Sequence, residues 1–514
     1  MSKVNLDALI PREDFEIEEV INAGTKKNTL SIEDLKSDSF FFLNLRKPDF
    51  QRETNEWDEK KICQLIKSFL DGELIPALIL WRSTGGFVFV IDGAHRLSSL
   101  SAWINSDYGN GTLSKYFFDS QIPEEQIEIH NKTKKLIDSE IGSYEDFKMA
   151  LQFPDRVKPE ILQRAKNLAS LAIQVQWVEG NALKAENSFF KINQQAAPID
   201  KTELKLIENR RNANSIAARA VIRSGTGHKY WSKFSQDHQE QITNLAREIN
   251  SLLFYPKLET PIRTLDVPVA GKLSTSSTLP LILDIINITN KISKGLGEDK
   301  TGEETIQVLK RAQKFIRILN SDHPSSLGLH PIIYFYSKDG RLKVAMLYAM
   351  TYFIMLLNEK DKMKDFIKVR KSIEDIIFNY DYIIQQINRK YRSAINGAEH
   401  IARFLYQCQL FLNEGSNITE TLKKIKAVDN YGYLTLNEME STNATTSSDF
   451  NENRKSAVFI QESMRSLNLC KICGCPVHKN SISIDHIQKK SEGGLGTINN
   501  GQVTHPFCNT GFKS

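Results

Sequence analysis

Apolar residues recur at intervals of three and four positions through the middle of the chain, from about residue 260 to residue 425. Ile306, Leu309 and Ile316 follow this spacing, which predicts helices that bury one face. The longest apolar run, Val344 to Leu357, is about 14 residues long, shorter than the roughly 20 residues that cross a bilayer. We therefore expect a buried helix there, a mostly α-helical middle region and no membrane partner.

The pattern changes in the N-terminal third, where a helical spacing from Ile62 to Leu70 is followed by two β patterns. Apolar and aromatic residues fill positions 78–81 and 87–91, and a Gly-Gly pair between them can supply the positive φ angles of a hairpin turn. The second strand runs directly into Asp92-Gly93-Ala94-His95-Arg96, and a helix is expected to begin near Leu97. The strand therefore delivers a polar cluster to the start of a helix.

Residues 441–456, STNATTSSDFNENRKS, are polar and poor in apolar side chains, which is typical of a flexible linker. With this linker as a boundary, the chain is predicted to be an α+β multidomain protein. The predicted parts are an N-terminal extension (1–35), an α/β domain (36–235), a helical domain (236–440), the linker (441–456) and a C-terminal module (457–514).

Composition narrows the class of protein. The 514 residues carry a net charge of +5, which is too mild to identify a nucleic-acid binder on its own. The N-terminus lacks a basic stretch followed by an apolar one, so no secretion signal is expected. Cys63 and Cys408 are isolated while the other four cysteines cluster near the C-terminus, which indicates a reducing, cytoplasmic location. No G-x4-G-K-[ST] pattern is present, which argues against a motor ATPase of the P-loop class.

The C-terminal module holds two pairs of metal-binding residues, each with two residues between its members. Cys470 with Cys473, and His505 with Cys508, can hold one tetrahedral Zn²⁺. Cys475 offers an alternative partner for Cys470, although the usual two-residue spacing favours Cys473. Such a set is often only a structural zinc ribbon, so further residues must decide whether the module also carries chemistry.

Polar residues that zinc does not need lie between and after these pairs. Asp485-His486-Ile487, Gly493-Gly494, Asn500 and Asn509 accompany C-x2-C and H-x2-C, and this order resembles an HNH nuclease of the ββα-metal type. The resemblance implies that His486 is the general base, that Asp485 and Asn509 hold a divalent cation, Mg²⁺ or Mn²⁺, and that Asn500 orients the histidine or braces the loop. The family commonly has a proline after the DHI motif, whereas Gln488-Lys489-Lys490 makes the loop more basic here.

The DGAHR cluster has the features of a phosphate site, with backbone N–H groups at a helix start, a glycine, and His95 and Arg96 as donors. The alternative is a simple turn in which Arg96 pairs with Asp92 or Glu73. Convergence of Arg96 with the arginine of an upstream Gln-Arg pair favours a pocket instead. Its predicted lining is Gln51, Arg52, Asp92, Gly93, His95 and Arg96.

The pattern FQR…W…IP…L…IDGAHRLSSL, within roughly residues 35 to 230, resembles the ParB/sulfiredoxin-like fold in its DGQQR-bearing branch. That branch forms the N-terminal part of modification-dependent restriction enzymes of the GmrSD and SspE kinds, so the resemblance implies a nucleotide-binding regulatory domain for GTP or ATP. Ala94-His95 replaces the common Gln-Gln, which leaves the nucleotide preference open. Phe189–Asn193 and Asp200–Leu204 also match, as a strand or turn before a helix that Thr202 could cap.

Together the two resemblances predict a metal-dependent HNH DNA endonuclease that a ParB-like domain controls by binding a nucleoside triphosphate or by sensing DNA. Restriction of foreign DNA, such as phage DNA, is the role that this combination implies. Two alternatives remain: a non-cleaving, zinc-containing DNA-binding regulator, and an NTPase whose tail anchors it to DNA. One nuclease centre cuts one strand at a time, so double-strand cleavage would need two visits or a dimer.

Overall fold

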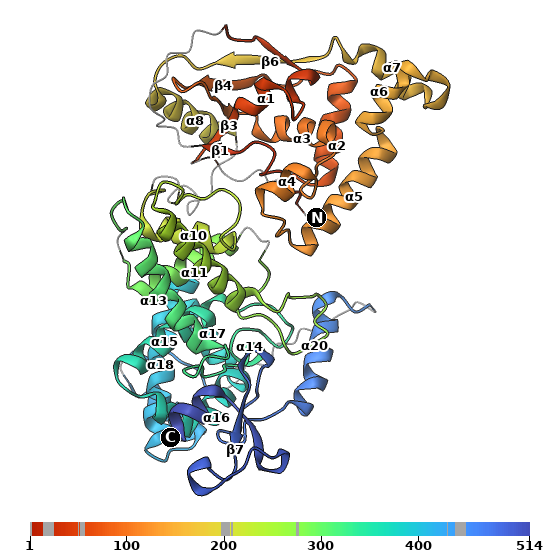
Figure 1. The fold of residues 1–514 in the computed structure, drawn as a ribbon. Coiled ribbons are helices and arrows are strands. Elements are labelled where there is room, and N and C mark those ends of the chain that lie inside the picture. The colour runs from red at the N-terminus through yellow and green to blue at the C-terminus, as the bar shows by residue number, and fades with distance from the viewer. Residues whose placement is uncertain are drawn as a thin grey trace. The chain divides into compact units, whose positions relative to one another are not determined.

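The computed structural model describes residues 3–13, 25–49, 51, 57–196, 206, 209–273, 277–293, 295–428, 430–436 and 449–513, with only the backbone of 193–196. The chain divides into two compact units, both drawn in Figure 1. One comprises Met1–Arg210 with Thr226–Tyr230, and the other comprises Arg211–Gly225 with Trp231–Ser514.

The first unit is built on a six-stranded mixed sheet with the strand order β1-β3-β5-β4-β6-β2. The strands are β1 (Arg12–Glu13), β2 (Thr29–Ser31), β3 (Leu45–Pro48), β4 (Leu78–Arg82), β5 (Val88–Asp92) and β6 (Ala172–Trp177). β4 and β5 form the predicted antiparallel hairpin, whereas β3 runs parallel to β5 and β6 runs parallel to β4. The sheet thus brings the end of β5, where the DGAHR cluster begins, into the middle of the unit.

Helices cover both faces of this sheet. The helices of the unit are η1 (Ile32–Leu35), α1 (Phe40–Asn44), α2 (Glu59–Leu70), α3 (Ala94–Asn105), α4 (Thr112–Phe117), α5 (Glu124–Glu140), α6 (Tyr144–Gln152), η2 (Pro154–Arg156), α7 (Pro159–Leu168) and α8 (Ala182–Ala196). Alternate residues of β5 face different cores, as a strand covered on both sides requires. Val88 and Val90 join the core that contains Leu97 of α3, whereas Phe89 packs in the core that contains Phe189 of α8. α2 and α3 pack against each other on the first of these faces (Figure 1).

The structure corrects the predicted N-terminal extension. Val4, Leu9 and Leu30 are almost fully buried in the main core of the first unit. β1 and β2 form the two edges of the sheet, so residues 3–13 and 29–35 are part of the domain and not a separate segment. The apolar side chains of these short segments need the sheet to be shielded from water.

Two local predictions in this unit also differ from the structure. α3 begins at Ala94, three residues before the expected start, because β5 ends at Asp92 and the chain turns immediately at Gly93. Phe189–Asn193 lies inside α8 and is not a strand or turn. Asp200–Leu204, including Thr202, lies outside the described residues.

The second unit is mainly helical, as the apolar spacing predicts. Its helices before the C-terminal module are α10 (Ala213–Ile222), α11 (Gln236–Phe254), α12 (Thr278–Asn290), α13 (Glu303–Leu319), α14 (Pro331–Tyr334), α15 (Val344–Glu359), α16 (Met363–Asn379), α17 (Asp381–Tyr391), α18 (Ala394–Asn413) and α19 (Ile418–Lys426). α15 carries the long apolar run and is largely buried, packed against α18. α10 belongs to this unit, so the boundary falls near residue 210 and not at the predicted 235. Among the described residues, no helix combines the length and apolarity needed to cross a membrane.

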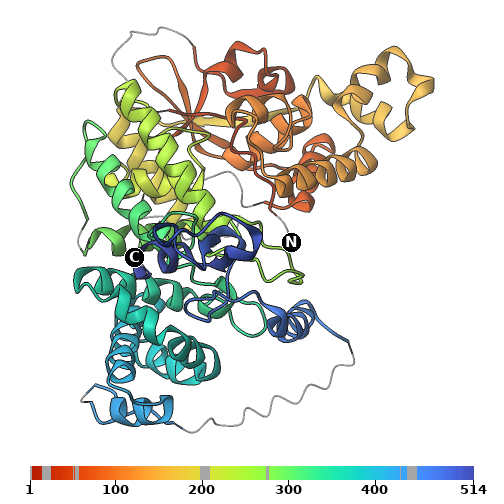
Figure 2. The ribbon, with the colours of Figure 1, turned by 60° about the horizontal axis from the view of Figure 1, so that its bottom comes forward.

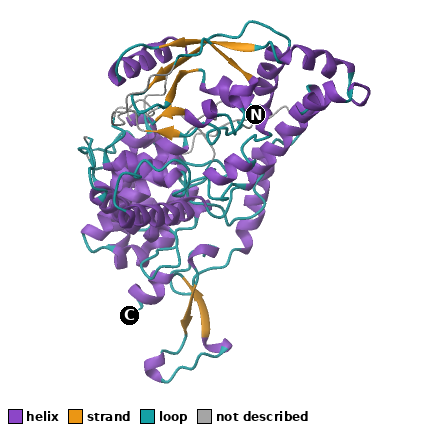
Figure 3. Ribbon diagram, turned by 45° about the horizontal axis from the view of Figure 1, so that its top comes forward, coloured by secondary structure: helices purple, strands orange, loops and turns teal. Residues whose placement is uncertain are grey.

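The C-terminal module belongs to the same unit as these helices. Its elements are α20 (Glu452–Ser463), η3 (Met464–Ser466), η4 (Lys479–Ser481), β7 (Ser483–His486), η5 (Lys490–Glu492), η6 (Ile498–Asn500), β8 (Gly501–Thr504) and the π-helical turn η7 (Cys508–Phe512). Figure 2 shows this blue segment lying across the green and cyan helices of the unit. Figure 3 shows the β7–β8 hairpin in orange, with its connecting loop reaching away from the helices.

The predicted linker is shorter than the polar composition suggests. α20 begins at Glu452, inside the range 441–456. Ser456 is buried, and its hydroxyl accepts a hydrogen bond of 3.0 Å from the Ile262 backbone N–H, so the end of this range is docked on the helical region. Residues 441–448 lie outside the described part of the chain.

Candidate active site and zinc centre

The four predicted zinc ligands converge in the C-terminal module. The ligand atoms of Cys470, Cys473, His505 and Cys508 all lie within 4.8 Å of one another. Cys475 is not part of this group, and its Sγ lies 3.6 Å from the Cys473 carbonyl oxygen. The arrangement therefore favours Cys473 over Cys475 as the partner of Cys470.

The backbone around the cluster orients its ligands. Gly474 N–H donates to the Cys470 carbonyl at 2.9 Å, which closes the turn that holds the first two cysteines together. His505 Nε2 lies 3.0 Å from the Pro476 carbonyl, and its Nδ1 lies 3.4 Å from Cys473 Sγ. An Nε2–H bonded to a carbonyl leaves Nδ1 free to bind metal, which is the usual arrangement of a zinc-binding histidine. Three thiolates and one imidazole nitrogen fit a tetrahedral Zn²⁺.

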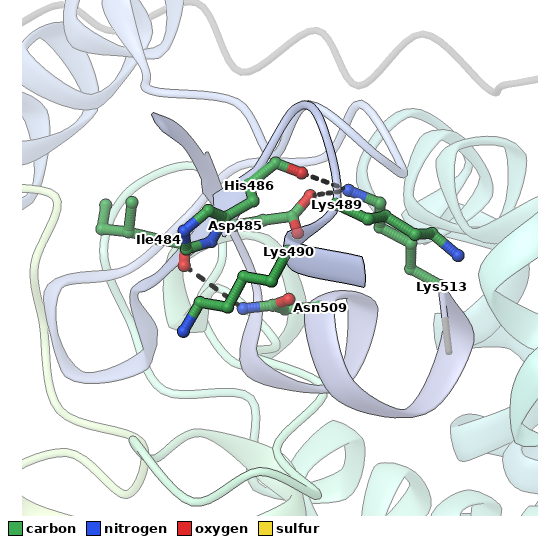
Figure 4. Close-up of a pocket in the computed structure, with 7 residues that line it drawn as sticks. All are labelled: Ile484, Asp485, His486, Lys489, Lys490, Asn509 and Lys513. Atoms are coloured by element: carbon green, nitrogen blue, oxygen red, sulfur yellow. Dashed lines mark hydrogen bonds and ion pairs between the residues drawn. The ribbon is translucent and has the colours of Figure 1, made fainter. Parts of the chain in front are cut away.

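A pocket of about 350 Å³ lies beside the β7–β8 hairpin and the helical turn that follows it. β7 and β8 are antiparallel, with Asp485 opposite Gln502 and His486 opposite Gly501. The residues that line the pocket are Ile484, Asp485, His486, Lys489, Lys490, Asn509 and Lys513 (Figure 4). Three of the predicted catalytic or metal-binding residues therefore share one pocket with three lysines.

Asp485 is the buried acid of this pocket, with 5% of its surface exposed. Its Oδ2 accepts hydrogen bonds from Gln502 Nε2 at 2.7 Å and from Lys513 Nζ at 2.6 Å. Lys513 Nζ also donates to the His486 carbonyl at 2.6 Å, so this lysine ties the end of the chain to both residues of the Asp-His pair. The fixed Oδ2 leaves Oδ1 as the carboxylate oxygen that is available to a ligand.

Asn509 is held by its amide nitrogen. Asn509 Nδ2 donates to Ser483 Oγ at 2.8 Å and to the Ile484 carbonyl at 3.3 Å, and Figure 4 shows the second contact within the pocket. These bonds orient the side chain so that Oδ1 is its free acceptor among the described residues. One carboxylate oxygen and one amide oxygen are the hard ligands that Mg²⁺ or Mn²⁺ prefers, so the residues present fit a divalent cation.

Asn500 has a different place from the other predicted catalytic residues. Its Oδ1 accepts from Gln488 N–H at 2.7 Å, and its Nδ2 donates to the Leu495 carbonyl at 2.8 Å. A Cβ added at Gly494 would lie 2.0 Å from the Gln488 carbonyl oxygen, so only glycine allows the loop to close this tightly. Of the two predicted roles for Asn500, these contacts favour bracing of the loop that carries Lys489 and Lys490.

Sequence reasoning missed Gln502 and Lys513 as parts of this site. Gln502 reaches Asp485 only because the hairpin register pairs them, and that register is not readable from residue spacing alone. Lys513 lies after the last recognisable motif residue, and only the helical turn from Cys508 to Phe512 brings it back to Asp485. A lysine one helical turn after the final asparagine was the only available signal.

The DGAHR cluster of the first unit lies where predicted, between β5 and the start of α3. Arg96 Nη2 donates to Asp92 Oδ2 at 2.6 Å, which is one of the two pairings that the simple-turn alternative predicts. The His95 ring stacks on Trp57 at a centroid distance of 5.5 Å. Arg52 lies outside the described residues.

Gln51 Oε1 and Arg96 Nε are among the buried atoms near this cluster that lack a partner within the described residues. Gln51 follows β3, which runs parallel to β5, so both strands end on the same side of the sheet. The N-terminus of α3 has no side-chain cap. Unpaired buried polar atoms are costly unless a ligand or water satisfies them, so these two atoms leave a donor and an acceptor for a partner at this end of the sheet.

Comparison with known families decides what the two ends of the chain are. Residues 32–210 match the family described as GmrSD restriction endonuclease, N-terminal domain, and residues 470–512 match the HNH endonuclease family. The chain joins a GmrSD-type N-terminal domain to an HNH endonuclease domain. No curated protein and no solved structure matches it.

The HNH match extends from the first zinc ligand to the last residue of η7, and it includes Asp485, His486, Asn500 and Asn509. The protein is therefore a nuclease, a metal-dependent hydrolase with DNA as its substrate, and its GmrSD-type domain places it among restriction enzymes. Residues 211–469, which include most of the helical region, lie outside both matches.

Proposed function

We propose that this nuclease hydrolyses phosphodiester bonds of foreign DNA, including phage DNA, in the pocket that contains Asp485, His486 and Asn509. The observation that carries the proposal is the presence in one pocket of a half-buried histidine, two oxygen donors and three lysines. Each component answers a requirement of the reaction: a base for water, ligands for a cation, and positive charge for the phosphate backbone.

His486 would accept the proton of the attacking water, since imidazole is the side chain best suited to this role at neutral pH. Asp485 Oδ1 and Asn509 Oδ1 would hold the divalent cation. The cation, when bound, offsets negative charge on the scissile phosphate and the leaving oxygen. Lys489 and Lys490, which are exposed at the pocket, would contact neighbouring phosphates and position the strand.

Cleavage of supercoiled plasmid in Mg²⁺ or Mn²⁺ tests this assignment. We expect His486→Ala to slow nicking by roughly 10²- to 10⁴-fold, the usual contribution of a general base. His238→Ala is the matched control, because His238 lies on α11 and contacts Thr301 instead of the pocket. Equal cleavage by the wild type and His486→Ala would contradict the assignment, and DNA left intact by both would favour a non-cleaving DNA-binding regulator.

The N-terminal domain, in this proposal, binds GTP or ATP and controls cleavage. The unpaired Arg96 Nε and Gln51 Oε1, the uncapped start of α3 and the Asp92–Arg96 pair support a site for phosphate groups. Arg52, His95 and Gly93 would complete its lining. A bound nucleotide would satisfy the orphaned donor and acceptor, and Arg96 could exchange its carboxylate partner for a phosphate.

Nucleotide control is tested by measuring DNA cleavage with GTP, ATP or neither, on modified and unmodified DNA. We expect one nucleotide to change the cleavage rate of the wild type and to have no effect on Arg96→Ala. A rate that is independent of both nucleotides would contradict the control. Phosphate release that Arg96→Ala loses and His486→Ala retains would show an NTPase activity in addition.

A further inference from the structure

The nuclease module is built against the helical region of its own unit through the segment from Pro324 to Gly328. The Ser326 carbonyl accepts a hydrogen bond from Phe507 N–H at 2.9 Å, and the Pro324 carbonyl accepts one from Thr510 Oγ1 at 2.8 Å. Ser326 Oγ lies 3.1 Å from Ser481 Oγ. These contacts hold the residues on either side of Cys508, so the last zinc ligand is fixed by a neighbouring part of the fold.

A second set of contacts holds the segment just after the cysteine turn. Lys479 N–H donates to Asp266 Oδ1 at 3.0 Å, and Asn480 Nδ2 donates to the Tyr255 carbonyl at 2.9 Å. Both acceptors belong to the helical region, between α11 and α12. The module is therefore seated on that region at several points, which differs from a domain attached only by a linker.

Gly328 approaches the zinc ligands most closely. A Cβ at this position would lie 2.5 Å from His505 Cδ2 and 2.7 Å from Ser481 Oγ, and its φ of +58° is one that other residues rarely adopt. The backbone of the helical region thus packs directly on the ring of a metal ligand, in a space that no larger residue could share.

Arg370 of α16 lies at the centre of this contact and is fully buried. Its guanidinium donates to Glu374 Oε1 at 2.9 Å, to the Leu327 carbonyl at 2.5 Å and to the Gly328 carbonyl at 3.0 Å. Nη1 also lies 3.3 Å from His505 Nδ1, the nitrogen that faces the cysteines. The cation therefore joins one carboxylate, two backbone carbonyls and the metal cluster.

The charges in this buried region explain why an arginine lies at position 370. Zn²⁺ with three thiolates and a neutral imidazole carries a net charge of −1, which is unfavourable in a buried site without a positive neighbour. A buried guanidinium is equally costly unless it is surrounded by acceptors and negative charge. Arg370 forms an ion pair with Glu374, and its Nη1 lies 3.3 Å from His505 Nδ1, so its positive charge is shared between this carboxylate and the Cys/His cluster.

We propose that Arg370 is a positioning residue for the zinc centre, supplied by the helical region. Its positive charge offsets part of the charge of the metal–thiolate cluster, and its hydrogen bonds to the Leu327 and Gly328 carbonyls hold the backbone that packs on the His505 ring. The nuclease domain is then complete only on its helical support. This inference goes beyond the proposed cleavage chemistry, because it concerns how the zinc centre is held and which part of the chain can influence it.

Zinc release from the full-length protein tests the role of Arg370. We expect Arg370→Met to lose zinc to a coloured chelator roughly 10- to 100-fold faster than the wild type, the usual cost of removing an outer contact of a metal site. Arg370→Lys should recover part of the loss, because it restores the charge without the planar geometry. Lys47→Met, which removes a fully buried lysine paired with Asp7 in the other unit, is the buried-cation control and should release zinc at the wild-type rate.

Co²⁺ in place of Zn²⁺ gives a readout that a general loss of stability would not move. The thiolate-to-cobalt absorption bands should shift in Arg370→Met, return toward the wild-type position in Arg370→Lys and stay unchanged in Lys47→Met. Superimposable spectra, together with release rates within about twofold of wild type, would overturn the proposal, since an outer contact of this kind normally contributes 10-fold or more.

If Arg370→Met does not fold, hydrogen exchange of the wild-type protein still tests whether the zinc centre and the helical region depend on each other. Leu327 N–H donates to the Ile318 carbonyl and Leu329 N–H donates to the Leu319 carbonyl, each at 2.8 Å. Removal of zinc should accelerate exchange of both amides if the two regions share one structure. Unchanged exchange there, with faster exchange at Gly474, would contradict the inference. None of these readouts needs DNA cleavage, so an incorrect catalytic assignment would leave their outcome unaffected.

Discussion

The two functional ends of this protein differ in how their sites are assembled. The HNH pocket and its zinc centre come from 44 consecutive positions, Cys470 to Lys513, in which one hairpin and one helical turn gather nearly every polar group. The N-terminal site depends on a six-stranded sheet whose order differs from the order of the chain. A short local motif can therefore specify chemistry at one end, whereas a long-range topology must do so at the other.

The difference has a consequence for how each site responds to mutation. At the nuclease end, each proposed role is assigned to one or a few side chains. Substituting two nearby residues of the same type and comparing the variants should therefore separate their roles. At the N-terminal end, Asp92, His95 and Arg96 already have partners within the fold, so loss of binding must be distinguished from loss of structure.

The largest effect is expected from substituting one or the other of Cys473 and Cys475, two cysteines that are separated by one residue. Cys473→Ser should abolish stable zinc binding and cleavage, because a structural zinc ion contributes on the order of 10 kcal/mol to the fold of a small module. Cys475→Ser should keep zinc, since its thiol lies outside the four-ligand cluster. Metal content after dialysis and the cleavage rate measure both variants. Equal zinc loss in the two variants would assign Cys475 to the site and contradict the geometry.

Substitution of Asn509 and substitution of Asn500 should reduce DNA cleavage in different ways. Asn509→Ala removes a proposed oxygen ligand of the cation, so we expect cleavage to fall by roughly 10- to 100-fold at low Mg²⁺ and to recover at high Mg²⁺. Asn500→Ala releases the Gln488 and Leu495 backbone groups, so its loss of cleavage should persist at every Mg²⁺ concentration. A Mg²⁺ titration of nicking separates the two, and identical titration curves would show that the residues share one role.

The sequence predicts residues within short local motifs, and it does not predict residues that only the fold brings to the site. The zinc ligands and the Asp-His pair lie in short motifs whose spacing is itself the chemical requirement. Lys513 and Arg370 were not predictable, because the first depends on a helical turn and the second packs against His505 across 135 positions. Only the fold places such residues near a metal.

In the N-terminal domain, elements with a clear apolar periodicity were predictable from the sequence, whereas very short strands were not. The β4–β5 hairpin was predictable because apolar side chains fill both strands around a Gly-Gly turn. β1 and β2 have two and three residues, too few to display alternation, so residues 1–35 looked like an extension. In α8, Ala185 and Phe189 are both buried and lie four positions apart, so this helical spacing decides the local structure instead of the strand or turn that the family pattern predicts.

A smaller effect is expected at the nucleotide site. Arg96→Ala should weaken GTP or ATP binding by roughly 10- to 100-fold, the value of a charge-assisted hydrogen bond of about 1.5–3 kcal/mol. Arg164→Ala is the control, because Arg164 forms a comparable ion pair with Asp71 at 2.8 Å in the same unit. Calorimetric titration measures binding, and the thermal midpoint of each variant shows whether the domain remains folded. Equal nucleotide affinity in both variants would remove Arg96 from the site.

The smallest predicted effect concerns acid stability where the nuclease module meets the helical region. His478 is fully buried there, with Nδ1 3.2 Å from Asn320 Oδ1 and its ring 5.4 Å from that of His330. Burial lowers the pKa of His478 to about 4, from an ordinary value of 6.5. The unfolded chain therefore binds a proton between these values while the folded chain does not, and stability falls as pH decreases through this window.

Between pH 7.5 and pH 5.5 this single group should cost about 1 kcal/mol of unfolding free energy. His478→Gln should have a shallower pH dependence than the wild type by that amount, although its stability at pH 7.5 is lower because a buried contact is lost. Urea unfolding of zinc-loaded protein at both pH values measures the difference. The comparison is made in a His330→Gln background, because the neighbouring His478 contributes to lowering the pKa of His330. The zinc ligands are present in both proteins, so their titration cancels. Parallel pH profiles would show that His478 binds a proton as readily in the folded chain as in the unfolded chain.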